Sequence, residues 1–153
     1  MVALFSALTL SSCKKDPCKN VSCQNGGTCQ DGNCKCNLPW EGSKCEVDAR
    51  DKFTGAWQGS ENCGSPRNYN TTIGKSQASP VRITIYEPDF QINYYAELTS
   101  STNFTIPQQT YTVGTAVLQI NGNGSLNGNT LIMNVTYNVG SDAFTCSYTL
   151  TRQ

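Results

Sequence analysis

Nine cysteines carry most of the chemistry that this 153-residue sequence offers. Six of them lie between residues 18 and 45, with the spacing C-x4-C-x5-C-x4-C-x-C-x8-C. Few apolar residues surround them, so disulfide bonds must hold this stretch together, and such bonds persist outside the reducing cytosol. Cys63 and Cys146 are far apart in a cysteine-poor region and can pair with each other. Cys13 is then left over for another role.

The chain contains no histidine, which removes the most common general base and the most common neutral-pH metal ligand. Outside unusual variants, this excludes Ser-His-Asp, Cys-His and zinc sites. Paired carboxylates of the glycosidase kind are conceivable, but acids at strand ends are far more often solvated. The acids in question are Glu61, Glu87, Asp89 and Glu97. We therefore expect no enzyme activity, no metal site and no cofactor.

The charge balance gives no sign of a nucleic-acid partner. Eleven basic and eleven acidic residues leave a formal net charge of zero, so no field attracts a polyanion. From Leu98 to Ser141 the sequence has no charged residue at all. A neutral face rich in Asn and Thr suits contact with carbohydrate or protein. It is equally compatible with a surface composition that is usual in the lineage of the protein and has no role in binding.

The first residues predict an export signal and a lipid anchor. Residues 1–12, MVALFSALTLSS, contain an apolar run that is too short for a membrane-spanning helix, which needs about 20 residues, but that suits a signal peptide. Its end, Leu10-Ser11-Ser12-Cys13, resembles the lipobox of bacterial lipoproteins, which implies cleavage before Cys13 and acylation of that cysteine. The sequence SCKKD resembles the start of Bacteroidetes-type lipoproteins. This implies an outer-membrane lipoprotein of the cell envelope, surface-exposed, with the lipidated Cys13 and its tether in residues 13–17.

The cysteine cluster over residues 18–45 resembles an EGF-like domain. Asn25-Gly26-Gly27 supplies the glycines of a tight turn, and Trp40-Glu41-Gly42 supplies the aromatic residue and glycine before the last cysteine. The spacing alone leaves the connectivity open. The resemblance implies the disulfides Cys18–Cys29, Cys23–Cys34 and Cys36–Cys45. The carboxylates of the calcium-binding subtype are mostly missing, so we expect a structural spacer without metal.

After a charge-dense linker over residues 46–52, the composition predicts β-structure. Apolar and polar residues alternate, as in Phe144-Thr145-Cys146-Ser147-Tyr148, and no helical period competes with this pattern. The expected strands are 53–60, 68–75, 81–87, 90–98, 102–106, 110–121, 129–138 and 143–152. Each lies close to the next, which favours an antiparallel up-and-down meander. Eight such strands can close into a barrel without exposed edges.

The start of this region also has a short family signature. Gly55 and Trp57, in Phe53-Thr54-Gly55-Ala56-Trp57, resemble the Gly-x-Trp motif of lipocalin-like barrels, in which the tryptophan closes one end. Barrel closure would bring the residue after the first strand, Cys63, beside Cys146 near the start of the last strand, so that they can form a disulfide, Cys63–Cys146. The predicted fold is all-β, with an EGF-like module followed by a lipocalin-like barrel over residues 53–153.

Together these features predict a non-enzymatic lipoprotein that acts as a binding module, with the barrel held off the membrane by the EGF-like spacer. An interior of Phe, Ile, Val, Leu and Tyr suits a small apolar ligand, although short strands are also compatible with a barrel filled by its own side chains. One alternative is a surface adhesion or scaffold module that contacts protein or glycan without a pocket. Another is an inhibitor or immunity-type partner of an envelope enzyme.

The anchor can be tested by replacing one residue. Cys13→Ser removes the thiol that would carry the lipid. Stable anchoring takes at least two membrane-binding signals, such as two acyl chains, so the variant loses its anchor. We expect the variant to move from the membrane fraction to the soluble fraction of its own host cells. A variant that still sediments with membranes would contradict the anchor assignment, and Ser12→Ala, one residue before, serves as the control that stays membrane-bound.

Overall fold

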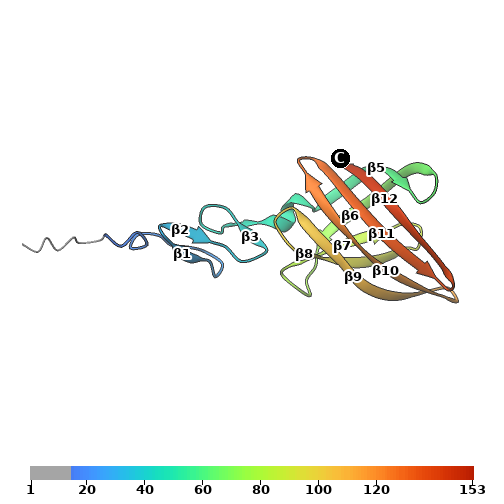
Figure 1. Ribbon diagram of the computed structural model, residues 1–153, viewed down its shortest axis with the longest axis horizontal. Helices are drawn as coiled ribbons and strands as arrows, with labels where there is room; N and C mark the ends of the chain where they lie inside the picture. The colour runs from blue at the N-terminus through green and yellow to red at the C-terminus, as the bar shows by residue number, and fades with distance from the viewer. Residues whose placement is uncertain (1–14) are drawn as a thin grey trace, which may run out of the picture.

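A computed structural model describes residues 15–153 as an all-β chain, with a disulfide-rich N-terminal region followed by a closed barrel of eight antiparallel strands (Figure 1). A short 3-10 helix, η1 (Ala49–Lys52), stands between them. The N-terminal region extends away from one end of the barrel. Among the described residues, no helix combines the length and the apolar character needed to cross a membrane. Cys13 and the expected signal peptide lie outside the described residues.

The N-terminal region contains two small hairpins and three disulfides. Strand β1 (Thr28–Gln30) pairs with β2 (Asn33–Lys35), and β3 (Trp40–Glu41) pairs with β4 (Val47–Asp48). The disulfides are Cys18–Cys29, Cys23–Cys34 and Cys36–Cys45, which are the pairs implied by the sequence resemblance. The expected tight turn is present, with φ of 49° at Asn25 and 75° at Gly26. Cross-links therefore replace a hydrophobic core in this region.

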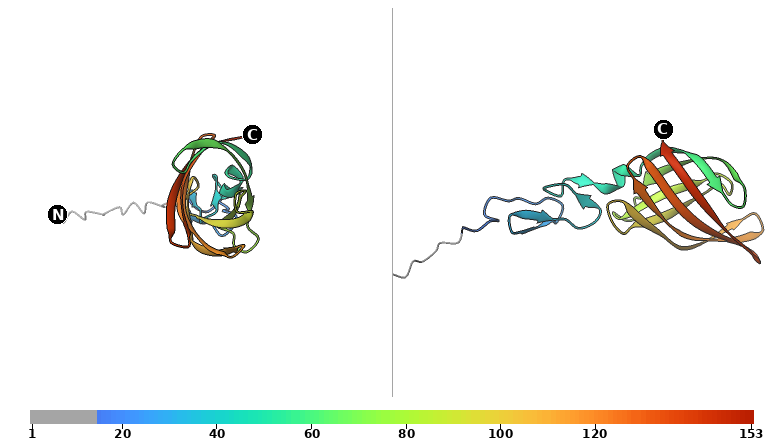
Figure 2. Two further views of the ribbon diagram at one scale, coloured as in Figure 1. Left: turned by 90° about the vertical axis from the view of Figure 1, so that its right-hand side faces the viewer. Right: turned by 45° about the horizontal axis from the view of Figure 1, so that its top comes forward.

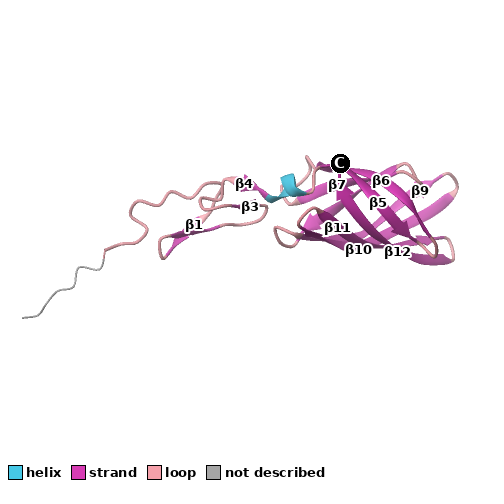
Figure 3. Ribbon diagram, turned by 90° about the horizontal axis from the view of Figure 1, so that it is seen from above, coloured by secondary structure: helices cyan, strands magenta, loops and turns pink. Residues whose placement is uncertain are grey.

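The barrel closes because its first strand pairs with its last. Its strands are β5 (Gly55–Asn62), β6 (Pro66–Lys75), β7 (Arg82–Glu87), β8 (Ile92–Leu98), β9 (Asn103–Val113), β10 (Ala116–Asn127), β11 (Thr130–Val139) and β12 (Asp142–Arg152). Each pairs antiparallel with the next, and β12 pairs with β5. The predicted up-and-down meander and its closure are confirmed. The left view in Figure 2 looks along the barrel and shows the strands arranged in a ring. Figure 3 shows that strands make up the described chain apart from loops and the short helix η1.

The barrel interior is filled by its own side chains. Alternate residues of each strand point inward, and bulky ones occupy the middle of the barrel. The largest fully buried side chains include Trp57, Tyr94, Tyr137, Tyr148, Phe53, Phe104, Ile83, Ile85, Leu118, Ile120, Leu131 and Met133. Gly124 makes room for one of them, since a Cβ atom there would lie 2.2 Å from the Phe104 ring. This packing leaves the two ends of the barrel as the places where a ligand could enter.

The predicted turn between the fifth and sixth barrel strands is wrong. The sequence predicts strands 102–106 and 110–121, whereas β9 continues to Val113, the turn lies at residues 114–115, and β10 runs from Ala116 to Asn127. Pro107 is tolerated inside β9 because the ladder with β10 shifts register between Ile120 and Gly122, and β9 pairs with β8 only at its start. The glycines of β10 are there for close packing and not for a turn.

The junction between the two parts is held by an ion-pair cluster around Asp48. Its carboxylate caps η1 by accepting the Arg50 backbone N–H at 3.0 Å. It also pairs with the Arg50 guanidinium at 2.8 Å and with Lys75 Nζ on β6 at 3.0 Å. Burial opposes ionisation of Asp48, but the hydrogen bonds from Arg50 and Lys75 outweigh it and lower its pKa from 3.8 to about 2. Residues expected to form a linker thus form a structured joint.

Asp48→Ala should loosen this joint without unfolding the barrel. Loss of the cap alone costs about 1 kcal/mol, and the two ion pairs are lost with it. Because the folded-state pKa is lowered, the contribution of Asp48 is present above pH 3.8 and is lost as the pH falls toward 2. We expect faster amide exchange at Phe53 and Thr54 in the variant, measured by NMR, with barrel amides unchanged.

The matched control for this experiment is Asp51→Ala. Asp51 pairs with the same lysine at 2.7 Å, but its side chain is 61% exposed. An exposed pair contributes little, so exchange at the joint should stay near that of the wild type. Equal exchange in the two variants would contradict the central role of Asp48.

Candidate functional site

A polar pocket lies at the end of the barrel that faces away from the N-terminal region. The turns after β5, β7, β9 and β11 meet at this end, which we call the mouth. The pocket has a volume of about 200 Å3 and is bordered by three acids, one arginine and several aromatic side chains. Its lining includes Glu61, Arg67, Glu87, Asp89, Phe90 and Phe144. The other end is closed by Phe53 and Trp57, both buried.

Two carboxyl groups are buried just inside the mouth. Glu61 on β5 is 2% exposed and Glu87 on β7 is 1% exposed. Each continues the inward-facing positions of its strand, Glu61 after Trp57 and Gly59, and Glu87 after Ile83 and Ile85. Buried carboxyls are costly unless they are hydrogen-bonded or paired, so their partners define the site.

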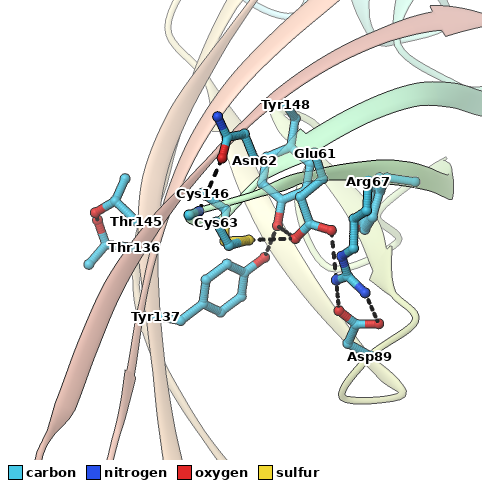
Figure 4. Close-up of a disulfide and its surroundings, with 12 residues drawn as sticks. Glu61, Asn62, Cys63, Arg67, Asp89, Thr136, Tyr137, Thr145, Cys146 and Tyr148 are labelled. Carbon is cyan, nitrogen blue, oxygen red and sulfur yellow. Dashed lines mark hydrogen bonds and ion pairs between the residues drawn. A yellow bond between two sulfur atoms is a disulfide. The ribbon is translucent and has the colours of Figure 1, made fainter.

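Tyrosine hydroxyls connect the two acids in a continuous chain. Glu87 Oε2 lies at hydrogen-bond distance from two hydroxyls, 3.0 Å from Tyr69 Oη and 2.7 Å from Tyr137 Oη. The Tyr137 and Tyr148 hydroxyls are 2.8 Å apart, and Tyr148 Oη lies 3.0 Å from Glu61 Oε1. Figure 4 shows the Tyr137 hydroxyl directed toward the Tyr148 hydroxyl, which in turn lies beside Glu61. Strands β5, β6, β7, β11 and β12 therefore meet in one buried network.

A guanidinium group lies at the outer edge of this network. Arg67 Nη2, on β6, is 2.7 Å from Glu61 Oε2, and Arg67 also pairs with Asp89 in the loop after β7 (Figure 4). Half of the arginine side chain is exposed. The hydrogen bond to Asp89 raises the pKa of Arg67, and the nearby charge of Glu61 adds to this effect. The mouth already holds one cation that belongs to the chain itself.

Aromatic rings form one wall of the pocket. Phe90 and Tyr137 have ring centroids 5.6 Å apart, and Tyr137 stacks on Phe144 at 5.5 Å. Phe144 remains 38% exposed. Aromatic faces next to carboxylates attract ammonium and guanidinium groups, because the ring quadrupole and the negative charge act in the same direction. The chemistry of the lining thus favours a positively charged ligand group.

Burial dominates the protonation of the network. It raises the pKa of Glu87, although hydrogen bonds from Tyr137, the Asp89 backbone and Tyr69 oppose the rise. Burial also raises the pKa of Tyr69, Tyr137 and Tyr148, so these hydroxyls keep their protons at neutral pH. The tyrosines therefore act as neutral hydrogen-bond donors.

The sulfur atoms at the mouth are joined to each other. Cys63 and Cys146 form a disulfide with a Cα–Cα distance of 4.2 Å, at the same end of the barrel as the sequence analysis expects. Glu61, Cys63 and Cys146 have potential metal-ligand atoms within 4.8 Å of one another in the described part of the chain. In the disulfide state these sulfurs are not thiolates and do not offer the ligands that a metal would need.

The sequence analysis names four acids that could contribute to a carboxylate pair, and the structure brings three of them together. Glu61, Glu87 and Asp89 meet at the mouth, whereas Glu97 pairs with Arg82 at 2.8 Å on the outside of the barrel. Gly55 opens β5, and Trp57 donates its indole N–H to Phe53 O at 2.7 Å at the closed end. Arg152, on the last strand, lies over the Trp57 ring at 5.4 Å.

Sequence reasoning missed the tyrosines and Arg67 as members of one site. Tyr69, Tyr137 and Tyr148 lie in predicted strands, and nothing in the sequence analysis links them to the acids. The sequence does contain one sign of the site. Glu87 follows Ile83 and Ile85 at every second position, so it faces the barrel interior and requires buried polar partners. A fourth tyrosine, Tyr94, is fully buried, and its hydroxyl has no hydrogen-bond partner among the described residues.

Compared with known proteins, the chain matches no family model, no curated protein and no solved structure. The functional argument therefore depends on the geometry of the mouth.

Two tyrosine-to-phenylalanine variants should behave differently. Tyr148→Phe removes the oxygen that links Tyr137 to Glu61 and leaves buried partners unsatisfied, which costs about 1–3 kcal/mol. Tyr94→Phe removes a buried hydroxyl that has no partner, so its free energy of unfolding should be unchanged or higher. Urea unfolding followed by tryptophan fluorescence measures both. A larger loss in Tyr94→Phe than in Tyr148→Phe would contradict the network.

Proposed function

We propose that this protein is a lipid-anchored binding protein of the bacterial cell envelope, and that it binds a positively charged ligand group at the mouth of its barrel. In this proposal Cys13 carries the lipid, the N-terminal region is an EGF-like stalk, and the barrel is lipocalin-like in its Gly55 and Trp57 closure. The proposal is supported by the placement of the mouth, which lies at the opposite end of the barrel from the stalk. An anchored stalk would thus present the mouth to the surroundings.

The observation that carries the proposal is the composition of the pocket. Three carboxyl side chains face one arginine, with the rings of Phe90, Tyr137 and Phe144 alongside. Arg67 holds Glu61 and Asp89 together, which is how a guanidinium from a ligand would be bound. A pocket of about 200 Å3 suits the end of a lysine or arginine side chain, or a small amine, more than a large molecule.

The filled interior argues against the small apolar ligand that the composition suggested. The middle of the barrel is occupied by its own aromatic and aliphatic side chains, and the pocket at the mouth is acidic. Catalysis by the carboxyl pair is also disfavoured by the geometry. Tyrosine hydroxyls and Arg67 occupy the inner oxygens of Glu61 and Glu87, so these groups are engaged in structure. Binding without chemical conversion is the function that the site supports best.

A titration with matched probes tests the proposal. N-acetyl-lysine amide should shift the backbone amide signals of the turns 63–65 and 88–91, whereas N-acetyl-norleucine amide, which lacks the charge, should not. Asp89→Asn should weaken binding about fivefold, equal to about 1 kcal/mol for one partly exposed ion pair. Glu97→Gln, which removes an acid that is not at the mouth, should bind like the wild type.

Two results would contradict the proposal. In one, the neutral probe binds as well as the charged probe, so charge is not recognised. In the other, the charged probe shifts amides outside the mouth, and Asp89→Asn has no more effect than Glu97→Gln.

A further inference from the structure

The network at the mouth has more hydrogen bonds than its tyrosines can supply protons for. Four contacts join oxygen atoms at hydrogen-bond distance: Tyr69 to Glu87, Tyr137 to Glu87, Tyr137 to Tyr148, and Tyr148 to Glu61. Each contact needs a proton between its oxygens, because two oxygens at 2.7–3.0 Å without one would repel each other. The three hydroxyls provide three protons. A fourth proton is required.

No neighbouring group of the described residues donates it to these oxygens. The other close neighbour of Glu61 Oε1 is Cys63 Sγ at 2.8 Å, and this sulfur is in a disulfide and carries no proton. Arg67 approaches the other oxygen, Oε2. The Asp89 backbone N–H donates to Glu87 Oε1 at 3.3 Å and not to Oε2. The missing proton must therefore belong to one of the two carboxyl groups.

We propose that Glu61 and Glu87 form a buried proton-binding site that holds one proton at neutral pH, and that Glu87 carries it. Glu61 lies 2.7 Å from the Arg67 guanidinium, with which it forms an ion pair. Glu87 has no such partner, and its Oε2 atom lies between two tyrosine hydroxyls. With the proton on Glu87, the chain runs in one direction: Glu87 donates to Tyr137, Tyr137 to Tyr148, and Tyr148 to Glu61.

The groups around Glu87 agree with this assignment. They are Glu61 on β5, Arg67 and Tyr69 on β6, Asp89 in the loop after β7, Tyr94 on β8, Tyr137 on β11 and Tyr148 on β12. Burial raises the pKa of Glu87, and the negative charge of Asp89 raises it further. The pKa values of the surrounding tyrosines are raised as well, so the proton of Glu87 is the one that leaves first as the pH rises.

This proton gives cation binding a pH dependence, a consequence that rests on the proposed function. A cation in the pocket stabilises the ionised form of Glu87, so binding should release a proton and become tighter as the pH rises. The folded state without ligand behaves in the opposite way. Glu87 has a higher pKa in the folded than in the unfolded state. Its contribution to the free energy of unfolding is therefore full below pH 4.5 and is lost as the pH rises through the folded-state pKa.

The proton can be observed directly on the full chain. Carbon-13 NMR of the glutamate side-chain carboxyls should show one protonated carboxyl at neutral pH, with the others ionised. That signal should disappear in Glu87→Gln and remain in Glu97→Gln. Glu87→Gln should also keep the unfolding midpoint of the wild type at neutral pH, because the amide is neutral and still offers a donor. Glu61→Gln should lower the midpoint, since it removes the charge that faces Arg67.

The proposal is overturned if all glutamate carboxyls are ionised at neutral pH, or if the protonated signal survives in Glu87→Gln. If Glu61→Gln does not fold, the spectra of the wild type and Glu87→Gln decide the matter alone. A separate readout tests the link to function. Calorimetry of N-acetyl-lysine amide in two buffers of different ionisation enthalpy should show release of close to one proton. A protonated Glu87 in a protein that binds no amine would refute the proposed function and leave the proton site standing.

Discussion

The carboxyl groups of Glu61 and Glu87 impose the strongest constraint on this structure, because an acid inside a closed barrel must have partners. Water does not solvate them, so strands from opposite sides of the sheet supply hydroxyls. Tyr137 and Tyr148 come from β11 and β12, Tyr69 from β6, and the guanidinium from Arg67. These contacts form only when the barrel is closed, since β5 must lie beside both β6 and β12. Closure of the barrel and the hydrogen bonding of its buried acids therefore depend on each other.

The two ends of the barrel have different roles as a result. At the end next to the N-terminal region, Trp57 and Phe53 form an apolar plug, and Asp48 pairs with Lys75 on β6. At the mouth, buried acids and tyrosines take the place of apolar packing, and the disulfide Cys63–Cys146 ties β12 to the turn after β5. Buried polar networks are less tolerant of change than apolar cores, because one missing partner leaves the others unsatisfied.

Much of the fold could be predicted from the sequence, and the parts that could not have physical reasons. The alternation of Phe144, Cys146, Tyr148 and Leu150 predicts the last strand because one face is buried along its whole length. Pro107 and Gly122 misled the prediction, because their effect depends on a bulge that is visible only once the partner strand is in place. The cysteine pairing at the mouth followed from topology alone.

The site was harder to predict, since it is assembled across the barrel. Glu61 and Glu87 are 26 positions apart in the numbering, and a single sequence does not show that the tyrosines of β11 and β12 lie between them. Sequence reasoning treated the acids as solvated strand ends. One local sign speaks against this interpretation, since Glu87 lies in register with the buried Ile83 and Ile85 of its strand.

Neutron diffraction from crystals of the deuterium-exchanged protein at neutral pH is the most direct test of this account, because it locates the hydrogen positions on which the network depends. We expect deuterium on Glu87 Oε2 directed toward Tyr137, a Tyr137 hydroxyl directed toward Tyr148, a Tyr148 hydroxyl directed toward Glu61, and no deuterium on Glu61. Two bare carboxylates, with the Tyr137 and Tyr148 oxygens turned apart, would contradict it.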